Sequence, residues 1–391
     1  MMPDFDEIIS REGTSCVKYD LRPFFFETND VIPLWVADMD FRTPRFIIDA
    51  LKLRLEHEIL GYSFRPDSYF QALIEWQKRR HNWNIEKEWI LFSPGVVPAL
   101  NMSVLSLTNP GDKIVVQPPV YAPFFEAVQQ NGRKLVENPL VQNESGRFEM
   151  NFSHLESLFQ EGVKMMILSN PHNPCGTVWS FDELEKLSRL CIQYSVLVLS
   201  DEIHCDLVYK PLKHIPLATM SNEIANLTIT AIAASKTFNI AGLSTSSLVI
   251  SNPDLRAKVS KQIDDLHIWL GNIFGNIATE VAYKKGADWL ESLMVYLKEN
   301  VETVCQWAGN HSDKLSVFPP EATYMMWLDF RKSGLSNADL RNWMIKKAGL
   351  GLNSGIEFGT GGDGFMRLNI ACPRLILRKA LNQIEQAFAE I

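Results

Sequence analysis

The chain has 391 residues, of which 46% are hydrophobic and 21% charged, a composition typical of a folded protein with two domains or one large domain and an appendage. Its formal net charge of -8 argues against nucleic acid as a partner, since nucleic-acid binding requires a basic surface. The apolar runs are far shorter than the roughly 20 residues of a membrane span, and residues 1–10 lack the features of a signal peptide. Six cysteines without a C-x-x-C pair favour a reducing compartment, so we expect a cytoplasmic protein without a membrane partner or a metal site.

The pattern between about residue 90 and residue 251 predicts an α/β protein. The first forty or so residues are predicted to be irregular and to pack onto the C-terminal part of the chain. From about residue 90, short apolar runs alternate with helical patterns, as in βαβ units. Several runs are apolar on both faces, which is typical of a parallel sheet with helices on both sides. The predicted strands are Trp89–Ser93, Lys113–Gln117, Lys164–Ser169, Val196–Ser200, Leu227–Ala233 and Ser247–Ser251.

One helix between these strands has its own start signal, because Ser180 and Glu183 have the spacing of a capping box. After about residue 290 the pattern changes to that of a smaller α+β domain. Its predicted elements are a helix at Trp289–Ala308, a strand at Tyr324–Phe330, a helix at Asn337–Ala348, a strand at Gly364–Ile370 and a helix at Leu375–Phe388. We therefore predict an N-terminal segment over residues 1–45, a large domain over 46–288 and a small C-terminal domain over 289–391.

Polar and glycine-rich or proline-rich clusters follow the predicted strands, where ligands bind in sheets of this kind. Lys236 follows an apolar strand, where desolvation lowers the pKa of an amine and makes it a nucleophile toward an aldehyde. Alone, such a lysine is equally a solvated surface group. Residues 170–176 contain two Asn-Pro pairs, which form a rigid loop or turn that presents Asn173. Asp201 ends the next strand and is a candidate helix cap, ion-pair partner or partner of a protonated ring nitrogen.

Three motifs carry a family resemblance: N-P-x-N-P-x-G at 170–176, D-E-I-H at 201–204 and S-K at 235–236. In this order and spacing they resemble the fold-type I pyridoxal-phosphate (PLP) enzymes typified by aspartate aminotransferase. The resemblance spans nearly the whole chain and is closest to the cystathionine β-lyase branch known as MalY/PatB. It implies a mostly parallel sheet of the seven-stranded type, within a large PLP-binding domain. Supporting matches are Trp35–Phe41, Gly61-Tyr62, Pro119–Tyr121 and Phe365–Asn369.

The resemblance implies a role for each residue that would contact the ring or the substrate. Lys236 would hold the cofactor as a Schiff base, and Asp201 would keep the ring nitrogen protonated. Asn173 would donate to the phenolic oxygen and also contact the substrate. Tyr121 would stack on the ring. Arg367 would bind the substrate α-carboxylate through two parallel hydrogen bonds, which lysine cannot reproduce. Ala37 is a further substrate contact that the resemblance implies.

The resemblance also implies how the phosphate is bound. The backbone N–H groups of Gly95, Val96 and Val97 begin a helix, whose dipole favours an anion. Ser235 would add a hydroxyl group. In this family Tyr62 reaches the phosphate of the neighbouring subunit, so we expect a homodimer with shared sites.

Three positions depart from the aminotransferase pattern. His204 stands where a tyrosine is usual, Ser244 where an arginine grips the phosphate, and Ala233 where S-x-S-K has its first serine. The lyase branch shares the histidine and lacks the arginine, so these changes favour that branch. His204 itself is interpreted either as a cofactor contact or as a buried structural histidine.

We therefore predict a PLP-dependent C–S β-lyase that acts on cystathionine or a related L-cysteine S-conjugate and releases thiol, pyruvate and ammonia. An aminotransferase of an L-amino acid is the alternative, because transamination uses the same lysine and the same electron sink. A PLP-binding regulatory protein ranks lower, since no basic helix-turn-helix segment precedes residue 35. The natural substrate stays open.

Overall fold

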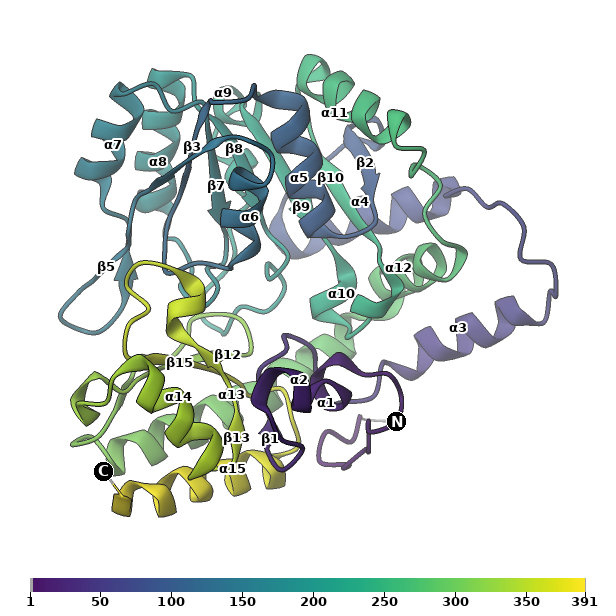
Figure 1. Cartoon of the computed structure of the whole chain (residues 1–391). Helices are drawn as coiled ribbons and strands as arrows, with labels where there is room; N and C mark the ends of the chain where they lie inside the picture. The colour runs from purple at the N-terminus through teal and green to yellow at the C-terminus, as the bar shows by residue number, and fades with distance from the viewer. Residues whose placement is uncertain (1–2, 391) are drawn as a thin grey trace.

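The computed structural model describes residues 3–390 and has two parts (Figure 1). A large sheet with its helices occupies the upper part of the figure. The C-terminal segment forms a smaller body below it, and the N-terminal segment lies against this smaller body. The α/β fold with a smaller α+β part is the predicted one. The exact boundaries 1–45, 46–288 and 289–391 stay a prediction.

The large sheet has seven strands in the order β2-β10-β9-β8-β7-β3-β4. Only β10 runs antiparallel to its neighbours in this sheet, so the prediction of a mostly parallel sheet is confirmed. Sequence analysis missed β4, a short edge strand with half-exposed and exposed side chains that lacks the pattern of a buried strand. The strands are β2 (Ile90–Ser93), β10 (Ser246–Val249), β9 (Thr228–Ile232), β8 (Leu197–Asp201), β7 (Met165–Ser169), β3 (Lys113–Val116) and β4 (Lys134–Glu137).

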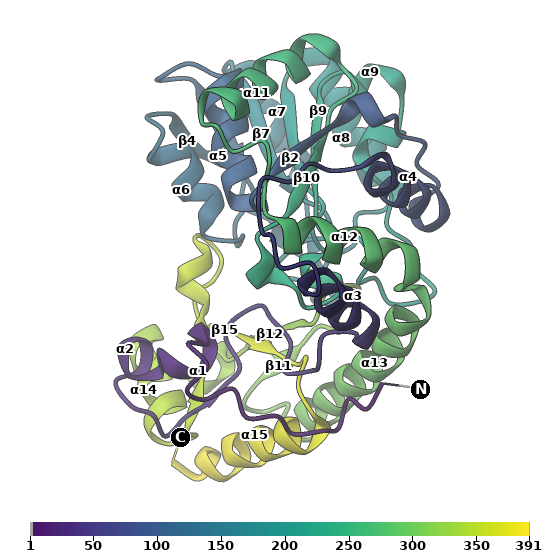
Figure 2. The ribbon, with the colours of Figure 1, turned by 90° about the vertical axis from the view of Figure 1, so that its right-hand side faces the viewer.

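Helices cover both faces of this sheet, as the double-sided apolar strands require (Figure 2). Successive residues of β7 point into different cores: Met165 and Ile167 into one, Met166 and Leu168 into the other. The first core also contains side chains of α5, α6 and α11, and the second contains those of α7 and α8. The helices of this part are α3 (Arg45–Leu55), α4 (Asp67–His81), α5 (Val96–Leu107), α6 (Pro123–Gln129), α7 (Phe152–Gln160), α8 (Phe181–Tyr194), α9 (Asn222–Ala225), α10 (Ala234–Thr237), α11 (Pro253–Asp265) and α12 (Ile273–Lys285).

The predicted capping box is present at the start of α8, where Ser180 and Glu183 bond each other's backbone N–H groups. Among the described residues, no helix is both long enough and apolar enough to cross a membrane. A two-stranded ribbon, β5 (Val141–Gln142) with β6 (Phe148–Glu149), lies outside the large sheet.

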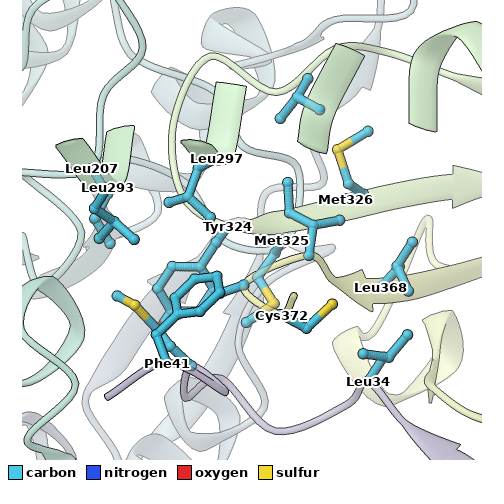
Figure 3. Packing of buried hydrophobic residues seen from close by; sticks show 14 of the residues in the cluster. Leu34, Phe41, Leu207, Leu293, Leu297, Tyr324, Met325, Met326, Leu368 and Cys372 are labelled. Carbon is cyan, nitrogen blue, oxygen red and sulfur yellow. The ribbon is translucent and has the colours of Figure 1, made fainter. Parts of the chain in front are cut away.

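The smaller body is built on an antiparallel sheet in the order β11-β12-β15-β14. The N-terminal segment packs on it, and its strand β1 pairs with β13. Figure 3 shows Phe41 of this segment packed near Tyr324 in the same core as Leu297 of α13. The elements are α1 (Val17–Asp20), α2 (Arg22–Phe26), β1 (Ile32–Pro33), α13 (Ala287–Asn310), β11 (Ser316–Val317), β12 (Met325–Asp329), α14 (Asn337–Lys346), β13 (Leu350–Gly351), β14 (Asn353–Ser354), β15 (Phe365–Asn369) and α15 (Arg374–Ala387).

Candidate active site

The predicted site residues converge because their strands are neighbours. Asn173 follows β7, Asp201 ends β8, and Lys236 lies in α10, directly after β9. These three strands are parallel and adjacent, so their carboxyl ends meet at one edge of the sheet. Arg367 comes from β15 of the smaller body and donates from Nη1 to Oδ1 of Asn173 over 3.1 Å. The site therefore lies where the two parts of the molecule meet.

The amine of Lys236 donates to the backbone oxygen of Ala37 over 2.6 Å. Burial lowers the pKa of Lys236 to about 8; the charge of Arg367 lowers it further, and Asp38 and Asp201 oppose these effects. A larger share of this amine is neutral near neutral pH than in an exposed lysine. Sequence analysis expected this desolvation from the position of the residue after an apolar strand.

The backbone at Ala37 is held by residues that sequence analysis did not single out. The hydroxyl of Tyr324 donates to the same oxygen of Ala37 over 3.0 Å. The side-chain amide of Asn369 donates to the oxygens of Val36 and Asp38, each over 2.6 Å. The matching motifs at Trp35–Phe41 and Phe365–Asn369 contained this signal, but only the folded chain brings them together.

The carboxylate of Asp201 is buried beside the lysine. Burial raises the pKa of Asp201 to about 7, although the N–H of Ile203 and the charge of Lys236 act in the opposite direction. Within residues 3–390 its recorded hydrogen-bond donor is the Ile203 N–H, at 3.1 Å. A buried carboxylate with so little compensation is suited to pair with a cation that a ligand supplies.

Arg367 is buried among neutral acceptors. Besides Asn173, its guanidinium donates to the backbone oxygen of Trp35 over 3.0 Å and to Oδ1 of Asn353 over 2.8 Å. Its Nε has no partner among the described residues, and the guanidinium lies 4.8 Å from the ring centroid of Phe358. Burial lowers the pKa of Arg367 to about 10. A buried cation held only by neutral groups is prepared for an anionic ligand.

Tyr121 and His204 lie near these charged groups. The pKa of Tyr121 is raised, first by burial and also by Asp201, while Arg367 opposes the shift. Burial lowers the pKa of His204 to about 3, and the charges of Lys236 and Arg367 add to this, so the imidazole is neutral. Its Nδ1 has no partner in the described part of the chain. Both interpretations of His204 remain, because a cofactor contact and a structural role fit these facts.

The expected phosphate-binding residues are divided between two places. Gly95 is the N-cap of α5, and Val96 and Val97 form its first turn, while Ser235 directly precedes Lys236. Tyr62 belongs to the segment between α3 and α4, is 99% exposed, and lines a groove with Pro94 beside the start of α5. The predicted role of Tyr62 in a neighbouring subunit stays a prediction.

The chain is similar to known proteins over its whole length. It is 43% identical to cystathionine beta-lyase PatB of Bacillus subtilis (strain 168), over 99% of this chain and 100% of that protein. The structure of cystalysin from Treponema denticola, which contains a pyridoxal 5'-phosphate cofactor, matches 100% of both chains with a TM-score of 0.97 and 34% identity. The PLP-bound C–S lyase from Staphylococcus hominis matches 99% of this chain and 98% of its own, with a TM-score of 0.91 and 33% identity.

These structures define the class: the chain has the fold of PLP-dependent enzymes of the aminotransferase type. The model of the family "Aminotransferase class I and II" matches residues 29–384. The chain belongs to this family, and its identity to PatB places it in the MalY/PatB branch. The predicted resemblance is thereby confirmed.

The residues at the site fit PLP, the cofactor of this class. An aldehyde requires a neutral amine, and the pKa of Lys236 is lowered to about 8. A protonated ring nitrogen requires an anion, and Asp201 is a buried carboxylate with one recorded N–H donor among residues 3–390. The unpartnered Nδ1 of His204 is a further polar atom that a ligand here would satisfy.

Proposed function

We propose that this chain is a PLP-dependent C–S β-lyase that cleaves cystathionine or a related L-cysteine S-conjugate and releases thiol, pyruvate and ammonia. The observation that carries the proposal is the buried guanidinium of Arg367, held only by neutral acceptors at the edge of the sheet where Lys236 lies. A carboxylate beside this guanidinium would place the α-carbon of an amino acid near the lysine. The names of PatB and of the S. hominis C–S lyase support elimination as the outcome.

Each remaining residue has a role in binding the cofactor. Asp201 pairs with the ring nitrogen, Asn173 bonds both the ring oxygen and Arg367, and Tyr121 covers one ring face. The N–H groups of residues 95–97 bind the phosphate at the start of α5, with the hydroxyl of Ser235. These groups supply what the missing arginine at Ser244 would otherwise provide. Ala37 contacts the substrate, and His204 contacts the cofactor.

Lys236 performs the proton transfers of this reaction. With PLP and substrate bound, the free amine of Lys236 would take the proton from the α-carbon. Bound PLP supplies an electron sink for the electron pair left behind. In the elimination this pair would form a double bond to the β-carbon while the carbon–sulfur bond breaks and its electrons leave with the thiolate. The backbone oxygen of Ala37 accepts from Nζ of Lys236 and would hold the free amine in place.

The first test of this function uses L-cystathionine without a keto acid. We expect purified PLP-loaded protein to release pyruvate and free thiol continuously, while the absorbance of the covalently bound cofactor returns after each turnover. A coupled pyruvate assay and a thiol reagent measure the two products together.

An aminotransferase would give a different result in the same assay. Transamination would stop after one turnover, with the cofactor converted to its amine form, and would resume when a keto acid is added. That outcome would overturn the lyase proposal. The absence of turnover with cystathionine, cystine and other S-conjugates, despite tight PLP binding, would instead indicate a regulatory protein.

The protein also functions as a homodimer in this proposal. Four large apolar side chains of the segment between α3 and α4 are exposed, which is typical of an interface. They are Ile59 at 71%, Leu60 at 56%, Tyr62 at 99% and Phe64 at 75%. Tyr62 also lines a groove of about 730 Å³ with Pro94 and Ser244, next to the start of α5. A partner covering this groove would bring its own Tyr62 to the phosphate site.

Mixed dimers test this sharing of sites. We expect Tyr62→Ala and Lys236→Ala homodimers each to be strongly impaired. When the two variants are co-expressed with different tags, half of the dimers are mixed, and each mixed dimer has one complete site. The mixture should therefore recover about a quarter of wild-type activity. No recovery in purified mixed dimers would show that Tyr62 serves its own subunit or none.

All six cysteines are free, and four of them are buried. Free thiols in this number are typical of a reducing compartment. We therefore assign the protein to the cytoplasm.

A further inference from the structure

A buried carboxylate outside the site described above lies behind Lys236. Asp206 is 3% exposed and accepts three hydrogen bonds from side chains. Its Oδ1 accepts from Nε1 of Trp76 and contacts Nε2 of His81, both at 3.0 Å. Its Oδ2 accepts from the hydroxyl of Thr237, also at 3.0 Å. Thr237 is the residue next to the cofactor lysine.

These bonds join three elements, two of which carry site residues. Asp206 follows β8 by five residues, so it shares a short segment with Asp201. Thr237 belongs to α10, which also carries Lys236. Trp76 and His81 belong to α4, the helix that follows the exposed segment with Tyr62. One carboxylate thus connects the element that would hold the ring nitrogen to the element that would hold the reactive carbon.

Helix α10 needs such an anchor. It has four residues, and a helix this short has too few internal hydrogen bonds to hold its own position. Adjacent helical residues point about 100° apart, so the lysine faces the site while Thr237 is fully buried on the other side. Burial alone would raise the pKa of Asp206, but the bonds from His81 and Trp76 hold it below its usual range. The anchor is therefore an ionised group, which makes the stronger kind of hydrogen bond.

We propose that Asp206 is a positioning residue, which fixes the position of Lys236 relative to Asp201 through the hydroxyl of Thr237. This inference rests on the proposed function and deepens it. The separation between Asp201 and Lys236 must match the length of the cofactor ring, and the bond from Asp206 to Thr237 sets that separation. The residue acts on the reaction only through Thr237, because the amine itself bonds to Ala37.

Metal binding is the competing interpretation of this cluster. Donor atoms of His81, Cys205 and Asp206 lie within 4.8 Å of one another, beside a groove of about 1770 Å³. The carboxylate, however, already uses three of its roughly four lone-pair positions. A cation here would also take Nε2 of His81 away from it. The observed bonds therefore favour an anchor.

Substitutions at Thr237 test the proposal without removing a charge. Thr237→Val keeps the shape and removes the hydroxyl, so we expect kcat to fall about ten- to a hundred-fold, the loss typical of a misplaced reacting group. KM should change much less, and the dissociation constant of PLP should rise. Thr237→Ser should restore kcat to within about three-fold of wild type. Thr230→Val is the matched control, because Thr230 is fully buried in the preceding strand and its hydroxyl has no partner among the described residues.

A second variant tests the proposal if Thr237→Val does not fold. Asp206→Asn should lower kcat in the same way. Adding Thr237→Val to it should lower kcat little further, because both substitutions break the same hydrogen bond between Asp206 and Thr237. Thermal unfolding of every variant distinguishes a displaced Lys236 from a general loss of fold stability. A Thr237→Val protein with normal kcat and normal PLP affinity would overturn the inference, as would a loss that serine does not repair or that Thr230→Val shares. Wild-type protein that releases no thiol would overturn the proposed function, while the PLP dissociation constants would still test the anchor.

Discussion

Replacing Lys236 by alanine is expected to abolish the reaction and the covalent attachment of the cofactor together. The variant lacks the amine that bonds to the aldehyde and later takes the α-proton, and loss of a positioned base alone costs about 10²- to 10⁴-fold. The measurement is the rate of thiol release, with the visible absorbance of the PLP-loaded protein. The fold should survive, because the helix and the core beneath it do not depend on this side chain.

Lys285→Ala is the control for this experiment. Lys285 is exposed at the end of α12, so its loss should leave both rate and colour unchanged. A Lys236→Ala protein with wild-type absorbance and turnover would show that another amine holds the cofactor. That result would remove the basis of the proposed function.

Replacing Asp201 by asparagine should produce opposite effects in the loaded and cofactor-free proteins. In the loaded protein the ring nitrogen loses its anion, and breaking a buried pair costs about 3–5 kcal/mol. That corresponds to a rate lower by roughly a hundred- to several-thousand-fold. In the cofactor-free protein the same substitution removes a buried charge that the Ile203 N–H and the charge of Lys236 offset only in part, so we expect a gain in stability that is complete above about pH 7.

The pH dependence follows from the sign of the shift. Burial raises the pKa of Asp201 from 3.8 to about 7 in the folded chain, so the folded state loses stability as pH rises from about 4 to about 7, and the loss is complete and constant above pH 7. A shift of about three pKa units corresponds to about 4 kcal/mol. The amide of asparagine cannot ionise, so cofactor-free Asp201→Asn should unfold at higher urea concentration than wild type at pH 8, and both should unfold alike near pH 4. A less stable variant at pH 8 would contradict this account of the site.

Much of the fold and of the candidate site was readable in local sequence. Six of the seven strands of the large sheet were predicted, because strands buried on both faces are continuous apolar runs. Lys236, Asn173 and Asp201 were selected because each follows or ends such a run. The edge strand β4 and the reversed direction of β10 were not predicted, since a short half-exposed segment has no distinctive pattern and strand direction depends on the connections between strands.

The sequence by itself determined the fold class, the family motifs and the chemical types at the sheet edge, because periodicity and spacing are properties of the linear chain. Only the tertiary structure decided which distant groups meet. It placed the oxygen of Ala37 on Lys236, surrounded Arg367 with neutral acceptors, and buried Asp206 against Thr237. The residues of the first contact, Ala37 and Lys236, are 199 positions apart in the chain, and the pKa shifts depend on burial. The contacts and the pKa shifts therefore arise only when the chain is folded.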